Sequence, residues 1–184
     1  MDEKTILSVV IPYMEADSGK PAILKRCVDS LSQFDELLLI WNWRMGYAKP
    51  INKGLALAKG DFILVMNDDV ILTEGAIKDL CDPEAVTSPR INGIGKDFWG
   101  CVFCIPRWVY EKVGPMFEGY EISYFDDDDF REMLMAAGVP MRAVHTVNFD
   151  HPEGGRTLHT FTDRDEFFKE NQQLFKERWP KSQL

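Results

Sequence analysis

Two adjacent carboxylates, Asp68 and Asp69, follow an apolar stretch and are well suited to binding a cation. The apolar residues 62–66 come after a Gly-Asp turn and predict a buried strand of a mostly parallel sheet. Ligands bind at the carboxyl ends of such strands. Neighbouring carboxylates repel each other unless a cation lies between them or water solvates them. Their oxygens suit Mg²⁺ or Mn²⁺, although a solvated acidic turn explains the pair equally well.

Four consecutive aspartates, residues 126–129, open a predicted helix and form a second acidic cluster. The free N–H groups and positive dipole end of a helix stabilise carboxylates there, which explains one or two of the four. Adjacent like charges also raise each other's pKa, and a general base working near neutral pH would use a raised pKa. Helical spacing puts Asp126 and Asp129 near one face and Asp127 on another, so they cannot all face one reacting atom.

His151 lies in a glycine-rich loop that follows the strand predicted at 141–147, and Arg156 comes shortly after it. A histidine and an arginine in such a loop indicate an anion site. A structural histidine is the alternative interpretation.

Polar and aromatic residues also follow the first two predicted strands. Tyr13, after Pro12, could stack on a nucleobase, and Glu15 could accept hydrogen bonds from a base or ribose. Asn42 takes the corresponding position after the second strand. Ordinary loops would explain the same residues.

Alternating strands and helices over the first 70 residues predict an α/β unit with right-handed crossovers. The second half is less regular, with a Pro- and Gly-rich loop expected between residues 81 and 98. The expected strands are 5–11, 36–41, 62–66, 98–105 and 141–147, and the expected helices are 21–31, 49–58, 74–81, 107–113, 127–137 and 161–179.

The chain has 184 residues and a net charge of −9, which fits one domain and argues mildly against a basic nucleic-acid-binding face. Neither a signal peptide nor a run of about 20 apolar residues is present, which predicts a soluble, cytoplasmic protein. The four cysteines lack zinc-site spacing and are expected to be reduced thiols in the core. The glycine patterns of dinucleotide folds and P-loops and the serine elbow of hydrolases are missing.

Over roughly residues 5–158 the chain resembles family 2 glycosyltransferases of the GT-A fold. The matching segments, in the family's order, are the opening strand with its Pro-Tyr-x-Glu turn at 5–15, the glycine-containing segment at 46–61, Asn67-Asp68-Asp69, the acceptor-side segment at 100–118, Asp126-Asp127-x-Asp129, and His151 to Thr157. The resemblance implies a short, single-domain GT-A fold over 1–184, with a mostly parallel sheet flanked by helices. Residues 1–70 would be the nucleotide-binding half, 71–160 the acceptor and catalytic half, and 161–184 the C-terminal helix.

The activity implied is inverting, metal-dependent transfer of a sugar from a nucleotide-diphosphate donor to a carbohydrate or other hydroxyl acceptor, with Mn²⁺ or Mg²⁺. By position, Asp69 would be the chief metal ligand, Asp68 would assist at the ribose or the metal, and His151 would be a further metal or pyrophosphate contact. The donor pocket would comprise Pro12, Tyr13, Glu15, Asn42, Asn52 and Arg156.

The same resemblance makes Asp127 the catalytic base, which deprotonates the acceptor hydroxyl. Asp126 and Asp129 would position the acceptor.

The sequence departs from the family pattern in three ways. Asn67 leaves only two acids at the expected metal site, and Trp41-Asn42 replaces the acidic pair that often follows the second strand. The chain also lacks an elaborate acceptor domain, so the acceptor site would be open or completed by a second subunit, as in a homo-oligomer.

Two other functions are weighed. A sugar-nucleotidyltransferase should have a glycine-rich loop after Ile11, and none is present. A non-catalytic module that binds a nucleotide-sugar or a glycan has no need of both acidic clusters. A nucleic-acid acceptor is less favoured than a carbohydrate because of the negative charge.

Overall fold

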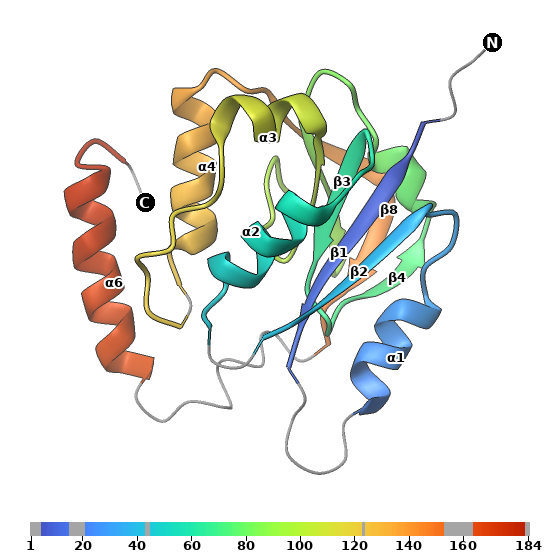
Figure 1. Ribbon diagram of the computed structural model, residues 1–184, viewed down its shortest axis with the longest axis horizontal. Coiled ribbons are helices and arrows are strands. Elements are labelled where there is room, and N and C mark those ends of the chain that lie inside the picture. Colours follow the sequence, from blue (N-terminus) through green and yellow to red (C-terminus); the bar gives the residue numbers. More distant parts are fainter. Residues whose placement is uncertain (1–4, 15–20, 43–44, 123, 153–163, 183–184) are drawn as a thin grey trace.

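The computed structural model describes residues 5–14, 21–42, 45–122, 124–152 and 164–182. Within these residues, eight strands form one sheet with helices on its faces (Figure 1). The strands are β1 (Leu7–Tyr13), β2 (Glu36–Trp41), β3 (Phe62–Met66), β4 (Ile71–Glu74), β5 (Val86–Ile91), β6 (Ile94–Gly95), β7 (Val102–Pro106) and β8 (Met141–Asp150). The helices are α1 (Pro21–Asp29), α2 (Ala48–Leu57), the 3-10 helix η1 (Ile77–Leu80), α3 (Arg107–Val113), α4 (Asp126–Ala136) and α6 (Arg164–Arg178).

The first half of the sheet is parallel, as the sequence predicts. Strand β1 lies between β2 and β3 and runs parallel to both. Although a stop was expected at Pro12, β1 continues to Tyr13, and Pro12 pairs with Ile40 of β2. The last β1–β3 pair is at Val10, so the missing N–H of Pro12 interrupts no ladder on that side.

The sheet becomes mixed in its second half, with the order β2-β1-β3-β7-β5-β8-β4. Strand β7 is antiparallel to β3 and β5, β5 is parallel to β8, and β4 is antiparallel to β8. The helix expected at 74–81 is wrong in part, because its first residue ends β4 and only η1 is helical. The loop expected after residue 81 instead contains β5 and β6.

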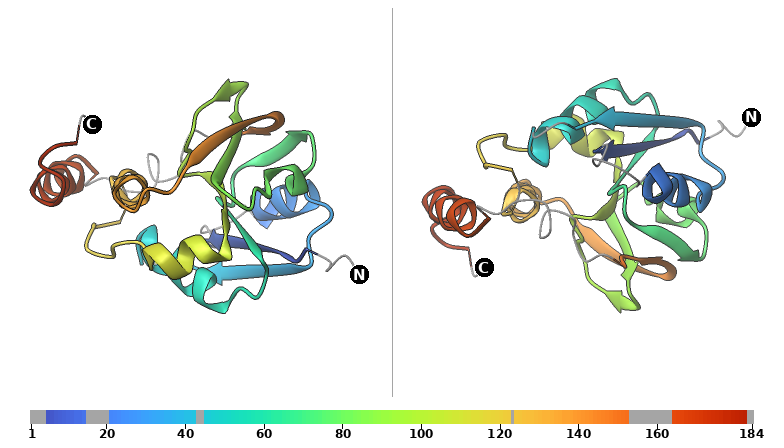
Figure 2. Two further views of the ribbon diagram at one scale, coloured as in Figure 1. Left: turned by 90° about the horizontal axis from the view of Figure 1, so that it is seen from above. Right: turned by 90° about the horizontal axis from the view of Figure 1, so that it is seen from below.

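Alternating strand residues divide the core between the two faces of the sheet. In β3, Ile63 and Val65 pack on the face covered by α2, α3 and α4, whereas Leu64 and Met66 pack on the face of α1 and η1. Phe130 in α4 completes the first cluster and contacts the ring of Phe103. Helix α6 packs outside α4, away from the sheet, in both views of Figure 2.

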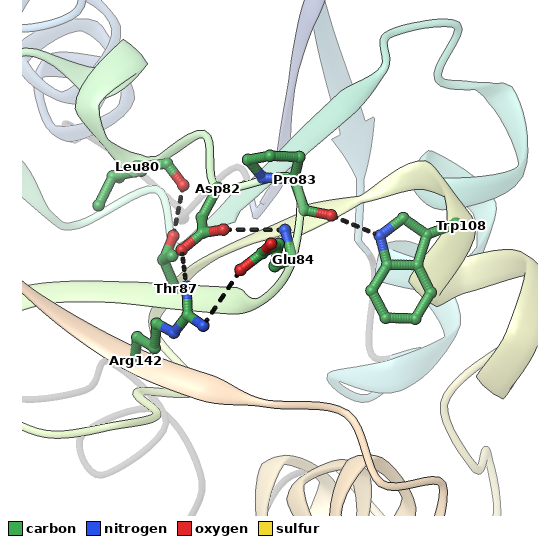
Figure 3. A network of polar contacts seen from close by, with 7 residues as sticks. All are labelled: Leu80, Asp82, Pro83, Glu84, Thr87, Trp108 and Arg142. Carbon is green, nitrogen blue, oxygen red and sulfur yellow. Dashed lines mark hydrogen bonds and ion pairs between the residues drawn. The ribbon is translucent and has the colours of Figure 1, made fainter.

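The strand directions bring several chain segments to one edge of the sheet. The carboxyl ends of β1, β2, β3, β5 and β8 lie at this edge, together with the starts of β7 and β4. The opposite edge is closed by hydrogen bonds around η1. There Arg142 at the start of β8 donates to Asp82, and Trp108 of α3 donates to the Pro83 carbonyl oxygen (Figure 3).

The expected α/β architecture, one sheet flanked by helices, is confirmed. All four cysteines are free thiols, but only Cys27 and Cys104 lie in the core as predicted, whereas Cys81 and Cys101 are half-buried. Within the described ranges, every helix is too short or too polar to cross a lipid bilayer.

Candidate active site

Asp69 and His151 meet at the edge of the sheet where the carboxyl ends of β3 and β8 lie. Asp69 Oδ1 lies 3.2 Å from His151 Nε2, and both side chains are largely buried. Apart from this ion pair, neither atom has a partner among the residues that the structure describes. The backbone N–H of His151 donates to Asn92 Oδ1, at the end of β5, which fixes the histidine's position on the edge.

The carboxylates strongly affect the neighbouring titratable groups. Asp69, followed by Cys101, raises the pKa of His151 to about 10. Burial, followed by the charges of Asp68 and Asp69, raises the pKa of Cys27 to about 12. Cys27 of α1 is therefore a neutral thiol, whereas the negative potential at the end of β3 favours a cation.

Asp69 and His151 fit a divalent cation. Two ligand atoms about 2.1–2.2 Å from one ion and at right angles to each other lie about 3 Å apart. The 3.2 Å between Asp69 Oδ1 and His151 Nε2 is close to this spacing. The described residues hold no cluster of three or more His, Cys, Asp or Glu side chains arranged for a metal. Further ligands would have to come from substrate or water, as is usual for Mg²⁺.

Asp68 points to a different neighbour. Its Oδ2 accepts a hydrogen bond of 3.3 Å from the backbone N–H of Met14, which follows β1. The carboxylate thus joins the ends of β3 and β1, where the donor pocket was predicted. A small hollow beside Asp69 is lined by Ile23 and Arg26 of α1.

Asp127 packs tightly against Gly100, which precedes β7. A Cβ atom built on Gly100 would lie 2.3 Å from Asp127 Oδ2, so only glycine permits this approach. Burial is the main cause that raises the pKa of Asp127, and hydrogen bonds from backbone N–H groups and the charge of Lys96 partly offset it. Asp127 therefore holds a proton more tightly than an exposed aspartate does.

Asp126 lies beside Asp127 and is 3% exposed. Burial, followed by the charge of Asp127, raises the pKa of Asp126 to about 8, and a hydrogen bond from the backbone N–H of Ala48 counteracts part of this. Its Oδ2 has no hydrogen-bond partner among the described residues. Tyr47 is also close, because the charges of Asp127 and Asp126 add to burial in raising its pKa.

The two acidic clusters converge at residues 100 and 101. Gly100 contacts Asp127, and its carbonyl oxygen accepts a hydrogen bond from the Tyr47 hydroxyl. The next residue, Cys101, interacts with His151, and its carbonyl oxygen accepts a hydrogen bond from the N–H of Asn67. The Asp69–His151 pair and Asp127 are therefore linked through adjacent residues at one edge of the sheet.

Three predicted site residues, Asp129, Asn52 and Asn42, make hydrogen bonds within the protein. Asp129 is 0% exposed, and its carboxylate is bound by Tyr120, Arg178 and Trp179. It cannot touch an acceptor, so we do not carry that role forward.

Asn52 and Asn42 are likewise engaged with the protein backbone. Asn52 donates to the Met116 carbonyl oxygen and accepts from the Met116 N–H, both at 2.8 Å. Asn42 donates to the Gly46 carbonyl oxygen and accepts from the Met45 N–H. These hydrogen bonds account for the positions of both asparagine side chains without a bound nucleotide-sugar. Their predicted roles in binding the nucleotide-sugar stay untested.

Only some of the other residues predicted to bind the nucleotide-sugar donor lie in the described part of the chain. Pro12 is buried, and Tyr13 is half-buried at the end of β1. Glu15 and Arg156 lie outside the described residues. Tyr47, Gly100 and Cys101 also lie at the site, although no role was predicted for them from the sequence. Gly46-Tyr47 and Gly100-Cys101 both fall within segments that resemble the family, which was the signal available for finding them.

Comparisons with known proteins identify the fold and a matching family profile. A sequence profile of Glycosyl transferase family 2 matches residues 16–83, which include β2, α2, β3 and the Asp68-Asp69 pair. This segment therefore matches a glycosyltransferase family, and the chain as a whole has the GT-A fold. The protein is thus a glycosyltransferase. No curated protein sequence matches the chain.

Solved structures show the fold of this glycosyltransferase at low sequence identity. The catalytic domain of Drosophila beta1,4-galactosyltransferase 7, in complex with xylobiose, has a TM-score of 0.66 and 16% identity, covering 89% of this chain and 79% of that one. GalNAc-T7 with UDP, GalNAc and Mn²⁺ has a TM-score of 0.66 and 14% identity, covering 82% and 44%. TarS of S. aureus has a TM-score of 0.65 and 13% identity, covering 97% and 40%.

Proposed function

We propose that this glycosyltransferase inverts the anomeric centre, depends on a divalent metal, and moves a sugar from a nucleotide-diphosphate donor to an acceptor hydroxyl. The observation that carries the proposal is the link through Gly100 and Cys101 between Asp127 and the Asp69–His151 pair. A cation site and a base at one sheet edge are what such a transfer needs. Similar folds support a donor of this class, since one was solved with manganese, UDP-Gal and xylobiose and another with UDP, GalNAc and Mn²⁺.

Asp69 and His151 are the residues that would hold the metal, with Asp68 beside them. The mixed carboxylate and imidazole donors favour Mn²⁺ over Mg²⁺, which prefers oxygen ligands. When bound, the cation would stabilise the negative charge that develops on the leaving diphosphate. Arg26, an exposed residue that lines the hollow next to Asp69, supplies a positive charge on the same side.

Asp127 acts as the general base in this proposal. Its carboxylate takes the proton of the acceptor hydroxyl as that oxygen attacks the anomeric carbon and the bond to the diphosphate breaks. Attack from the face opposite the leaving group inverts the anomeric centre. Burial makes Asp127 a stronger base than an exposed aspartate, and its contact with Gly100 fixes its side chain.

The substitution Asp127→Asn tests this role. It should lower the turnover number by roughly 10²–10⁴-fold, because a positioned base contributes that much. Donor affinity, measured by calorimetry with Mn²⁺ and UDP-galactose or UDP-GalNAc, should stay within about twofold of the wild-type value, since Asp127 is not a proposed metal ligand. NMR of the product should show inversion at the anomeric carbon.

Asp79→Asn is the matched control, because Asp79 is an exposed aspartate in η1. It should leave turnover unchanged. Unchanged turnover in Asp127→Asn would remove the base assignment, and a product with retained configuration would rule out the proposed mechanism.

A further inference from the structure

The backbone just before α4, the helix that carries Asp127, is strained. Ile122, Tyr124 and Phe125 have φ values of 60°, 79° and 68°, in the left-handed region that residues other than glycine rarely adopt. Phe125 immediately precedes Asp126, the first residue of α4. Such conformations persist only where surrounding contacts hold them. The contacts that hold this segment therefore also determine where α4 begins.

Asn171 of α6 supplies the first of these contacts. Its side chain is 1% exposed. Its Oδ1 accepts a hydrogen bond from the N–H of Glu121, and its Nδ2 donates to the carbonyl oxygens of Glu121 and Tyr124. One buried amide thus binds the backbone on both sides of Ile122. Phe168 and Phe175 of α6 also pack against the aromatic rings at 124 and 125.

Asp129 supplies the second contact, within the first turn of α4. Its Oδ2 accepts hydrogen bonds from Arg178 Nε at 2.7 Å and from Trp179 Nε1 at 2.8 Å. The Tyr120 hydroxyl donates to the same oxygen. The guanidinium of Arg178 also lies 3.5 Å from the ring centroid of Phe117. Helix α4 is therefore bound to the end of α6 at Asp129, two residues after Asp127.

We infer that α6, through Asn171 and Arg178, positions Asp127 for catalysis in the function proposed above. The helix holds both the strained segment before α4 and the first turn of α4, so the backbone of Asp127 lies between two fixed points. No space exists for Asp127 to move toward Gly100, where an added Cβ would lie 2.3 Å from its carboxylate. Asn171 and Arg178 are positioning residues, because they touch no proposed reacting group.

The test uses Asn171→Ala and Arg178→Lys in the full chain. Lysine keeps the charge of Arg178 but loses the planar fork that holds a carboxylate. Hydrogen–deuterium exchange should become faster at the amides of Glu121 and Asp129 in both variants. Turnover of a donor with Mn²⁺, with hydrolysis of UDP-galactose and UDP-GalNAc as first probes, should fall by roughly 10–100-fold at unchanged KM, since small displacements of a catalytic group have such effects.

Glu177→Ala is the control, because Glu177 lies on the exposed side of the same helix and binds only Gln173 in the described structure. It should change neither exchange nor turnover. Urea unfolding of each variant separates positioning from loss of folded protein, since turnover is expressed per folded molecule. Exchange equal to that of the wild type in both variants, or a loss of turnover no greater than the loss of folded protein, would overturn the inference.

The outcome for Asp127→Asn keeps the two proposals apart. If that variant is inactive while Asn171→Ala and Arg178→Lys retain wild-type turnover, the base assignment stands and the role of α6 does not. If Asp127→Asn is fully active, the proposed function fails, and the exchange result at residues 121–129 still reports whether α6 holds the start of α4.

Discussion

At the scale of single residues, the site depends on carboxylates whose burial is only partly offset by hydrogen bonds and positive charges. Asp126 and Asp127 share one helix start, and burial raises the pKa of both. Because the charge of each disfavours ionisation of the other, they titrate as a coupled pair rather than as two independent groups. Asp126, with a pKa of about 8, keeps its proton at neutral pH and leaves Asp127 as the single base, which suits deprotonation of a hydroxyl. The folded state is destabilised by this arrangement at neutral pH.

Asp126→Asn should therefore stabilise the protein in alkaline solution. The pKa of Asp126 is about 8 in the folded state, and that of an unfolded aspartate is about 3.9. The unfolded chain releases this proton first as the pH rises, so the free energy of unfolding falls from about pH 4 to about pH 8 and is then constant. Each pKa unit of difference corresponds to about 1.4 kcal/mol. Urea denaturation at pH 4.5 and 8.5 should show a smaller pH dependence in the variant than in the wild type.

Asp79→Asn again serves as a control, since it removes an exposed carboxylate and should leave the pH dependence unchanged. A pH dependence in Asp126→Asn equal to that of the wild type would show that Asp126 ionises normally in the fold.

At the scale of elements, the sequence predicted the regular first half well and the second half poorly. Strand β3 and helix α2 were expected within a residue or two, because hydrophobic periodicity determines them locally. Strand β5 was missed since its buried Thr87 and Ser88 read as polar loop residues. In the fold, Thr87 donates to the Leu80 carbonyl oxygen and Ser88 accepts from the N–H of Trp99, so burial leaves neither hydroxyl unpaired. Hydrogen bonds of this kind, between residues of different elements, cannot be predicted from a sequence pattern.

The same limit explains which site residues could be predicted. Asp69, Asp127 and His151 stand in motifs at element ends, and the fold brings their segments to one edge. The burial of Asp129 under α6 depends on Arg178, 49 residues away in the chain, so no local pattern indicates it. Gly100 matters because of its contact with Asp127, which is also a product of the fold.

Asn52 provides a test at this scale, because it joins α2 to the loop that follows α3. Asn52→Ala should lower the free energy of unfolding by about 1–3 kcal/mol for each buried partner left unpaired, which are the N–H and carbonyl oxygen of Met116. Donor affinity should stay unchanged. Lys53→Ala, at the neighbouring exposed position, should alter neither quantity. Weaker donor binding without loss of stability would instead support the donor role predicted from the sequence.

At the scale of the whole molecule, one sheet edge gathers residues from every part of the described chain. The residues that follow β3 and β8 contribute Asp69 and His151, the turn before β7 contributes Gly100, and α4 contributes Asp127. The opposite edge is closed by structural hydrogen bonds, such as the one from Arg142 to Asp82. Stability and chemistry are thus separated along the strand direction, as the rule for ligand sites in open α/β sheets predicts.

Metal binding should then stabilise the molecule through this edge alone. A cation that binds the folded state raises the free energy of unfolding by about 2.7 kcal/mol at a concentration 100 times its Kd. Mn²⁺ with UDP should raise the melting temperature of the wild type, and EDTA should reverse the shift. Asp69→Ala and His151→Ala should abolish it, because Asp69 Oδ1 and His151 Nε2 lie 3.2 Å apart and are the proposed metal ligands. Asp79→Asn should retain the shift. An equal shift in Asp69→Ala would mean that Mn²⁺ binds elsewhere, and the edge would lose its assigned cation.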